Sequence, residues 1–124
     1  MKLLLILFSC FITISCYAKT LGVSTLTKDK TNLKDYGFAY CLSKTKDTHL
    51  NKETSLALNA YFQKGNHDEP AYENLRKYIN SYLSKKTSIY QDTEMPARLI
   101  HCLDMYNLPE YNRLITKQDG YRIK

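Results

Sequence analysis

Hydrophobic residues recur at steps of three and four along most of the chain, which is the spacing of one face of an α-helix. Asp68 stands where an N-cap is expected, and Pro70 fits a first turn, where no backbone N–H is needed. These residues predict a helix that ends at about Ser84. Its stripe, the clearest in the chain, consists of Ala71, Leu75, Tyr78, Ile79, Tyr82 and Leu83.

Two weaker stripes precede this helix. A first helix is predicted from Thr31, with Gly37 inside it, which indicates either the close approach of another helix or a tolerated imperfection. A second helix is predicted over residues 51–64, with Asn51 as its N-cap and Gly65 as a left-handed stop. The apolar positions are Leu33, Tyr36, Tyr40 and Cys41 in the first helix and Leu56, Ala57, Ala60 and Tyr61 in the second.

Residues 85–92 (KKTSIYQD) form the one segment in the middle of the chain without a helical stripe. Asp92 or Thr93 is then predicted to cap a fourth helix that has Pro96 in its first turn. A short fifth helix is predicted from Pro109. The apolar positions are Leu99, Ile100, Cys102, Leu103 and Tyr106 in the fourth helix and Tyr111, Leu114 and Ile115 in the fifth.

The chain lacks any alternating period-2 run, so the fold class predicted is all-α. The 124 residues allow one small domain of about five helices over residues 31–117. A flexible lead-in over residues 19–30 is expected before it, and a frayed tail over residues 118–124 after it.

The first eighteen residues have the layout of a secretory signal peptide. Lys2 is followed by an apolar run over residues 3–14, and small residues, Cys16 and Ala18, stand at the −3 and −1 positions of a cleavage site. The run is too short to span a bilayer as a helix. We expect cleavage after Ala18, export, and no membrane segment in the mature form. An uncleaved anchor and lipidation at Cys16 are the alternatives, although no leucine stands three residues before that cysteine.

Two of the four cysteines, Cys41 and Cys102, remain after cleavage. A pair in an oxidising compartment is most simply one disulfide. The alternative is a metal site that adds His101, but adjacent residues on a helix point about 100° apart. No fourth ligand stands at the spacing of a zinc finger, so we expect no metal.

Charge and composition point away from chemistry and toward binding. The chain has 18 Lys and Arg against 12 Asp and Glu, scattered rather than gathered on one stripe, which argues against nucleic acid. The histidines His49, His67 and His101 stand beside no nucleophile motif, so neither an enzyme nor a cofactor is expected. Ten of the eleven tyrosines remain after cleavage, and the chain has no tryptophan. Ten tyrosines are more than a small core holds, and exposed tyrosine is a common interface anchor.

Four segments carry a resemblance to a known family: residues 32–42 (NLKDYGFAYCL), 60–66 (AYFQKGN), 100–106 (IHCLDMY) and 110–114 (EYNRL). Over about residues 31–117 the chain resembles the type VI secretion amidase immunity proteins. The resemblance implies a periplasmic, all-helical and usually homodimeric protein. Its partner would be a cognate papain-like cysteine amidase effector of the NlpC/P60 type, which cuts peptidoglycan peptides. The chain departs from the family at Leu108 and Pro109, where a small polar cap usually opens the last helix.

The resemblance further implies that a loop of the immunity protein fills the active-site groove of the enzyme, with contacts from a second protomer. The predicted effector-binding loop is the non-periodic segment, Lys85, Lys86, Thr87, Ser88, Ile89, Tyr90, Gln91 and Asp92. Ile89 and Tyr90 are apolar where a surface linker would stay polar, and the alternative is that they close the core between two helices. The alternative function is a periplasmic helical binding or adaptor protein, or an inhibitor of another cell-wall enzyme.

Overall fold

The computed structural model describes residues 26–124, so the signal peptide, its cleavage site and the start of the lead-in lie outside the described residues. This part of the chain is all-helical, as predicted, and its only β-type pairings are two isolated bridges. None of its helices combines the length and the hydropathy needed to cross a membrane. The elements are α1 (Lys28–Leu42), α2 (Thr48–Lys64), α3 (Glu69–Ser84), α4 (Arg98–Asn107), α5 (Pro109–Lys117) and the 3-10 turn η1 (Gln118–Tyr121).

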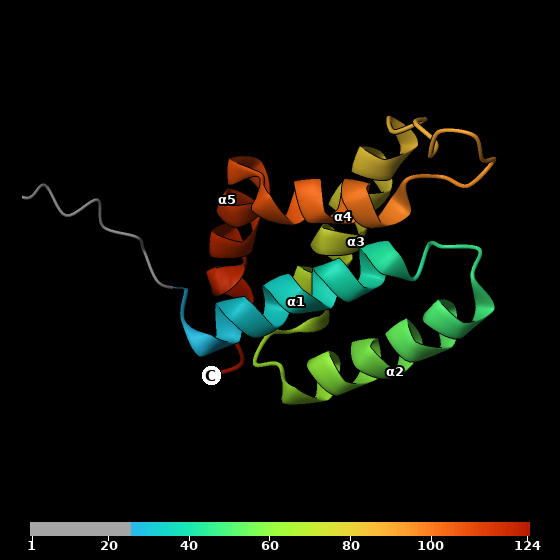
Figure 1. Ribbon diagram of the computed structural model, residues 1–124. Coiled ribbons are helices and arrows are strands. Elements are labelled where there is room, and N and C mark those ends of the chain that lie inside the picture. The colour runs from blue at the N-terminus through green and yellow to red at the C-terminus, as the bar shows by residue number, and fades with distance from the viewer. Residues whose placement is uncertain (1–25) are drawn as a thin grey trace, which may run out of the picture.

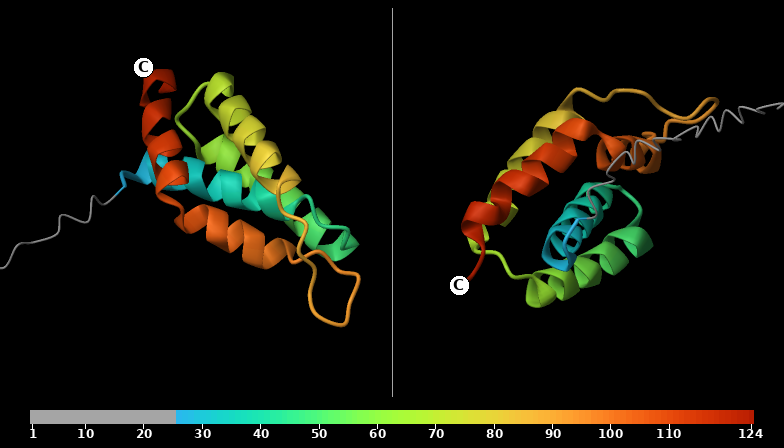
Figure 2. Two further views of the ribbon diagram at one scale, coloured as in Figure 1. Left: turned by 90° about the horizontal axis from the view of Figure 1, so that it is seen from above. Right: turned by 90° about the vertical axis from the view of Figure 1, so that its left-hand side faces the viewer.

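Helix α1 is the centre of the fold, because it contacts each of the other four α-helices. Figure 1 shows it between α4 on one side and α2 on the other, with α3 behind. The views in Figure 2 confirm that α2 and α4 do not share a side of α1. The core gathers around α1, with the fully buried side chains Leu33, Cys41, Ala71, Tyr72, Leu75, Ile79, Cys102, Met105, Tyr111 and Ile115.

Gly37 marks a close approach of a side chain from another helix to α1, which is one of the two alternatives that the sequence left open. A Cβ atom at this position would lie 1.9 Å from the hydroxyl oxygen of Tyr111. That hydroxyl donates a hydrogen bond to the carbonyl oxygen of Lys34 at 2.9 Å, so the buried ring has a polar partner. Glycine therefore lets α5 insert a large aromatic side chain against the backbone of α1.

The sulfur atoms of Cys41 and Cys102 lie 2.04 Å apart, at disulfide distance, and join α1 to α4. Both cysteines are fully buried. The pair therefore fixes α4 on the central helix.

Helix α2 ends at Lys64 as predicted, but it differs from the prediction at its start, in the conformation of its stop and on its face. It begins at Thr48 rather than at Asn51, because the Asp47 carboxylate accepts a hydrogen bond from the Leu50 N–H at 2.7 Å and caps the helix earlier. Gly65 has a φ of −74°, so the predicted left-handed stop is wrong. Leu56 is 64% exposed, and Thr54 is the only buried residue of the helix. Helix α2 therefore packs along α1 mainly through half-buried side chains such as Leu58 and Tyr61.

The C-terminal segment is held in place where the sequence predicted fraying. Gln118 is buried and accepts a hydrogen bond from the Asn74 side-chain amide at 3.0 Å. The Ile123 N–H donates to the Asn66 carbonyl at 3.1 Å, and Arg122 forms an ion pair with Asp29. The segment thereby connects α1, the α2–α3 connection and α3. These contacts are made by polar side chains and backbone groups, so hydrophobic periodicity gave no signal for them.

Candidate functional site

Residues 85–97 form the connection between α3 and α4, and they project beyond the ends of the helices (Figures 1 and 2). The predicted start of the fourth helix at Asp92 or Thr93 is wrong, because α4 begins at Arg98 and Pro96 lies outside it. We call residues 85–97 the projecting loop. It contains all eight residues of the predicted effector-binding segment, plus five that the sequence assigned to the next helix.

Backbone hydrogen bonds fold the projecting loop back on itself. Ile89 and Pro96 form an isolated antiparallel bridge. The Tyr90 N–H donates to the Met95 carbonyl at 3.0 Å, and the Ala97 N–H donates to the Ser88 carbonyl at 3.2 Å. The loop is therefore a short hairpin-like ribbon with a defined shape.

The turn at the tip of the ribbon is set by Asp92 and Thr93. Asp92 has a φ of 59°, the only positive value at a non-glycine residue among residues 26–124. Asp is one of the few side chains that tolerate this left-handed conformation. The Thr93 hydroxyl donates to the Tyr90 carbonyl at 2.9 Å and accepts from the Met95 N–H at 3.2 Å. Side chains and backbone thus both constrain the tip.

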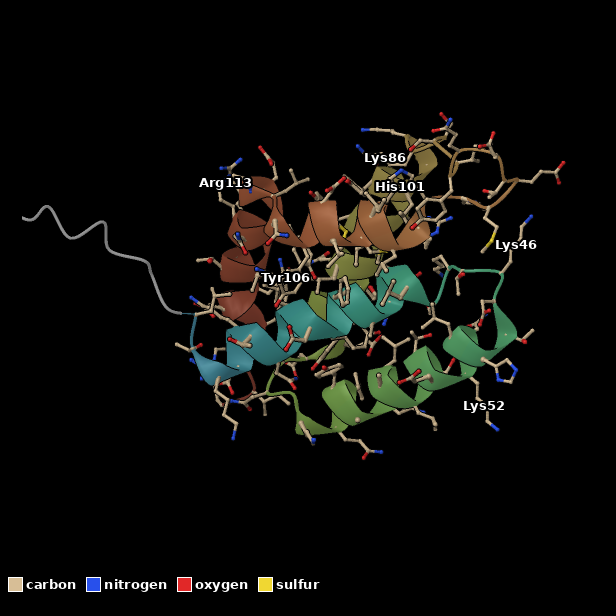
Figure 3. All side chains as sticks on the ribbon, in the orientation of Figure 1. Lys46, Lys52, Lys86, His101, Tyr106 and Arg113 are labelled. Atoms are coloured by element: carbon tan, nitrogen blue, oxygen red, sulfur yellow. A yellow bond between two sulfur atoms is a disulfide. The ribbon has the colours of Figure 1, made fainter. Side chains whose placement is uncertain are left out.

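The base of the loop is attached to α4 through Ser88 and His101. The Ser88 hydroxyl and His101 Nε2 lie 2.6 Å apart, and the imidazole is buried. Burial lowers the pKa of His101 from its ordinary value, and the nearby cations Lys86 and Arg98 lower it further. Figure 3 shows His101 and Lys86 together at this end of the molecule. His101 is next to Cys102, so the loop base is linked to the core.

Two large apolar side chains of the ribbon face solvent. Ile89 is 55% exposed and Met95 is 63% exposed, and neither contributes to the hydrophobic core. The alternative that Ile89 closes the core between α3 and α4 is therefore wrong. Tyr90 is half-buried but also lies outside the core cluster. Sequence reasoning missed Met95, because the residues before Pro96 were assigned to a helix cap.

Positive charge surrounds the base of the loop. Lys85 caps the C-terminus of α3, and the Lys86 ammonium lies 4.9 Å from the centre of the Tyr82 ring. A hollow of about 210 Å³ separates the loop from the α1–α2 connection, and its charged lining is mixed: Lys44, Lys46 and Arg98 with Asp47 and Glu94. Lys46 extends beside the loop in Figure 3. Thr87, Gln91 and Asp92, the remaining residues of the predicted segment, are exposed.

The described side chains around the loop are not grouped as metal ligands. Within residues 26–124, no three His, Cys, Asp or Glu side chains are grouped closely enough to hold a metal ion. The loop offers instead a shaped, exposed ribbon with apolar side chains and a basic base, which are features of a protein-binding surface.

Comparison with known proteins identifies the family of the chain. No protein of curated function matches the chain. The family model described as type VI secretion system (T6SS), amidase immunity protein (Tai4) matches residues 31–115, which is most of the chain and includes α2 to α4 and the projecting loop. The chain therefore belongs to the family of T6SS amidase immunity proteins.

Proposed function

We propose that this protein binds a cognate peptidoglycan amidase effector of the type VI secretion system and blocks its active-site groove with the projecting loop. It would act in the periplasm, after cleavage of the signal peptide behind Ala18, and protect the cell from its own or a sibling's effector. Family membership supports the general role, and the geometry of the loop supports the particular mode.

The observation that carries the proposal is the exposure of Ile89 and Met95 on a ribbon that is already ordered. A loop that keeps its bound shape loses little conformational entropy when it binds. Burying two such side chains in a groove removes apolar surface from water, which stabilises the complex. A loop that served only as a linker would gain nothing from presenting them to solvent.

Blocking a groove requires no chemistry from the inhibitor. A ribbon inside the active-site groove excludes the substrate peptide by occupying its place. Lys85 and Lys86 at the loop base would meet acidic groups at the edge of the groove. The Ser88 hydroxyl already contacts His101, so Gln91 is the side chain left to hydrogen-bond with the groove walls.

We also propose that the effector is a papain-like cysteine amidase and that this protein binds it as a homodimer. The homodimer follows from the resemblance to the family and from the surplus of tyrosine. A monomeric mass in sedimentation at tens of micromolar protein would refute it. The second candidate function, a helical adaptor or an inhibitor of another cell-wall enzyme, predicts no stoichiometric binding to an amidase.

The test uses the amidase encoded beside this gene and a double variant of the loop, Ile89→Ser with Tyr90→Ser. We expect its dissociation constant to rise by at least about tenfold, equal to about 1.4 kcal/mol, because both substitutions remove apolar contact surface. The readouts are calorimetric binding and residual amidase activity on isolated peptidoglycan.

The matched control replaces the same two residue types at the C-terminus, Tyr121→Ser with Ile123→Ser. These side chains are 40% and 52% exposed, and the segment lies away from the loop (Figure 1). We expect the control to bind the amidase as the wild type does. A well-folded loop variant with wild-type affinity would remove the loop from the mechanism, and a wild-type protein that does not bind the amidase would favour the second candidate.

A further inference from the structure

We propose that the outward face of α4 is the second half of the surface that binds the amidase. This inference rests on the proposed function and adds to it the helix that follows the loop. The surface consists of Leu99, Ile100 and Leu103 and is called here the α4 face.

The side chains of the α4 face are large, apolar and exposed to water. Leu99 is 50% exposed, Ile100 48% and Leu103 44%. With 100° between successive residues, these three positions lie within one arc of about 100°. The opposite side of the helix carries the buried residues Cys102 and Met105.

The α4 face is unusual because the solvent side of a surface helix is normally polar or charged. Asn107 is the only other residue in the same arc, so the arc contains no charged side chain. A contiguous exposed apolar patch is typical of a protein-interaction site. Helix α2 offers no comparable patch, because its exposed Leu56 and Phe62 are six positions apart and lie on different faces.

The size of a specific interface explains why the amidase is the expected occupant. Such an interface buries about 800 Å² on each partner and uses about 20–30 residues a side. The projecting loop has 13 residues, several of which face α4 or form the base, so it is too small to serve alone. Stable inhibition requires additional surface next to the loop.

The α4 face is the apolar surface that continues from the loop. Helix α4 begins at Arg98, directly after the last loop residue, so Leu99 and Ile100 of the α4 face lie in its first turn, next to the loop in the chain. The Ser88–His101 contact of 2.6 Å holds the loop base against the buried side of the same helix. The Cys41–Cys102 pair fixes α4 on α1, so loop and helix form one rigid unit. When the loop enters the groove, the enzyme surface beside the groove therefore meets the α4 face.

The test is the double variant Leu99→Ser with Leu103→Ser, measured against the same amidase. We expect the dissociation constant to rise by about tenfold or more, with an unchanged helical circular dichroism spectrum and an unchanged sedimentation coefficient. Leu56→Ser on α2 is the matched control, because that leucine is at least as exposed but lies on another side of α1, and it should bind normally.

A second variant covers the case in which the serine pair fails to fold. Asn107→Arg adds bulk and charge inside the same arc without removing any apolar contact, and arginine is favourable near a helix C-terminus. It should fold and bind the amidase about tenfold more weakly.

Three results would overturn the inference. Wild-type affinity in the folded variants would show that the enzyme does not touch α4. Dissociation of an oligomer with unchanged affinity would assign the face to a second copy of the chain. If Ile89→Ser with Tyr90→Ser weakens binding while the α4 variants do not, the inference fails and the proposed function stands. If the loop variant also binds the amidase normally, the proposed function itself has failed.

Discussion

The projecting loop and the C-terminal segment are both without helical periodicity, yet they are used in opposite ways. In the loop, backbone hydrogen bonds hold the ribbon together and leave the side chains of Ile89 and Met95 in water. In the C-terminal segment, side chains make the contacts: Gln118 is buried against α3, and Arg122 pairs with Asp29 of α1. Both segments expose apolar side chains, since Ile123 is 52% exposed, but only the C-terminal segment also buries a polar side chain, Gln118, within the fold.

The comparison teaches that the partners of the side chains, rather than the absence of regular structure, distinguish a binding loop from a structural one. It predicts that substitutions at exposed loop positions change affinity with little change in stability. Substitutions in the C-terminal segment should change stability with little change in affinity. The following predictions, ordered from the largest expected effect to the smallest, test this separation.

The largest effect is expected from the cysteine pair that joins α1 to α4. Replacing Cys41 and Cys102 with serine removes a crosslink between residues that are 61 positions apart. In the chain-entropy model this lowers the free energy of unfolding by roughly 4 kcal/mol. Urea unfolding should show this difference under oxidising conditions and little difference with a reductant present. Two reactive thiols in the denatured, unreduced wild type would contradict the pairing.

The second prediction makes the same substitution in the two regions. Gln118→Ala removes a buried side chain that accepts from Asn74 and donates to the Leu114 carbonyl, so the free energy of unfolding should fall by about 1–3 kcal/mol. Gln91→Ala at the exposed loop tip should change it by less than about 0.5 kcal/mol. Thermal unfolding measures both. Equal losses in the two variants would break the comparison.

The third prediction concerns the attachment of the loop. Ser88→Ala removes the hydroxyl contact to His101 and should lower the free energy of unfolding by about 0.5–1.5 kcal/mol. Amide hydrogen exchange should become faster in the loop, because its base is less constrained. Ser81→Ala on the exposed side of α3 is the control and should leave loop exchange unchanged. No difference between these variants would mean that the backbone alone orders the ribbon.

The smallest effect is expected from pH, with one buried histidine near each region. Burial is the main cause that lowers the pKa of His67, beside the C-terminal segment, and of His101, at the loop base, below the ordinary value of 6.5. The folded protein then binds fewer protons than the unfolded chain. The contribution of these two histidines to the free energy of unfolding should therefore be fully present above about pH 6.5. It should decrease as the pH falls below that value.

Urea unfolding at several pH values between neutral and mildly acidic measures how steeply the free energy of unfolding depends on pH. His67→Gln and His101→Gln should each flatten it, and both together should flatten it further. A stability that rises on acidification would contradict the sign of both pKa changes.

The sequence predicted the parts of the fold that depend on hydrophobic periodicity. The all-α class, the stripe of α3 through Leu75 and Ile79, and the proximity of Cys41 to Cys102 all follow from spacing or from the cysteine count. The close approach at Gly37 was also predicted as one of two alternatives. Periodicity captures these features because each of them buries apolar side chains at regular positions.

The errors lie where local backbone contacts override the pattern. Asp47 caps α2 earlier than Asn51, and the ribbon contact from Tyr90 to Met95 delays α4 until Arg98. A non-helical segment over residues 85–92 was predicted and forms most of the loop, whereas its role in binding stays a prediction. The exposed Met95 and the α4 face were not, because their helical spacing gives the same signal as a buried stripe.

The contact between Gly37 and Tyr111 also has a consequence for how this sequence can change. The Tyr111 hydroxyl occupies the space of a Cβ at position 37, so alanine there fits only after that oxygen is gone. With phenylalanine at position 111, the nearest remaining atoms are at 3.1 and 3.3 Å, which small shifts accommodate. The two positions form a linked pair in which the order of substitution matters: Tyr111→Phe must come first. A redesign that treats them independently would discard combinations that fold.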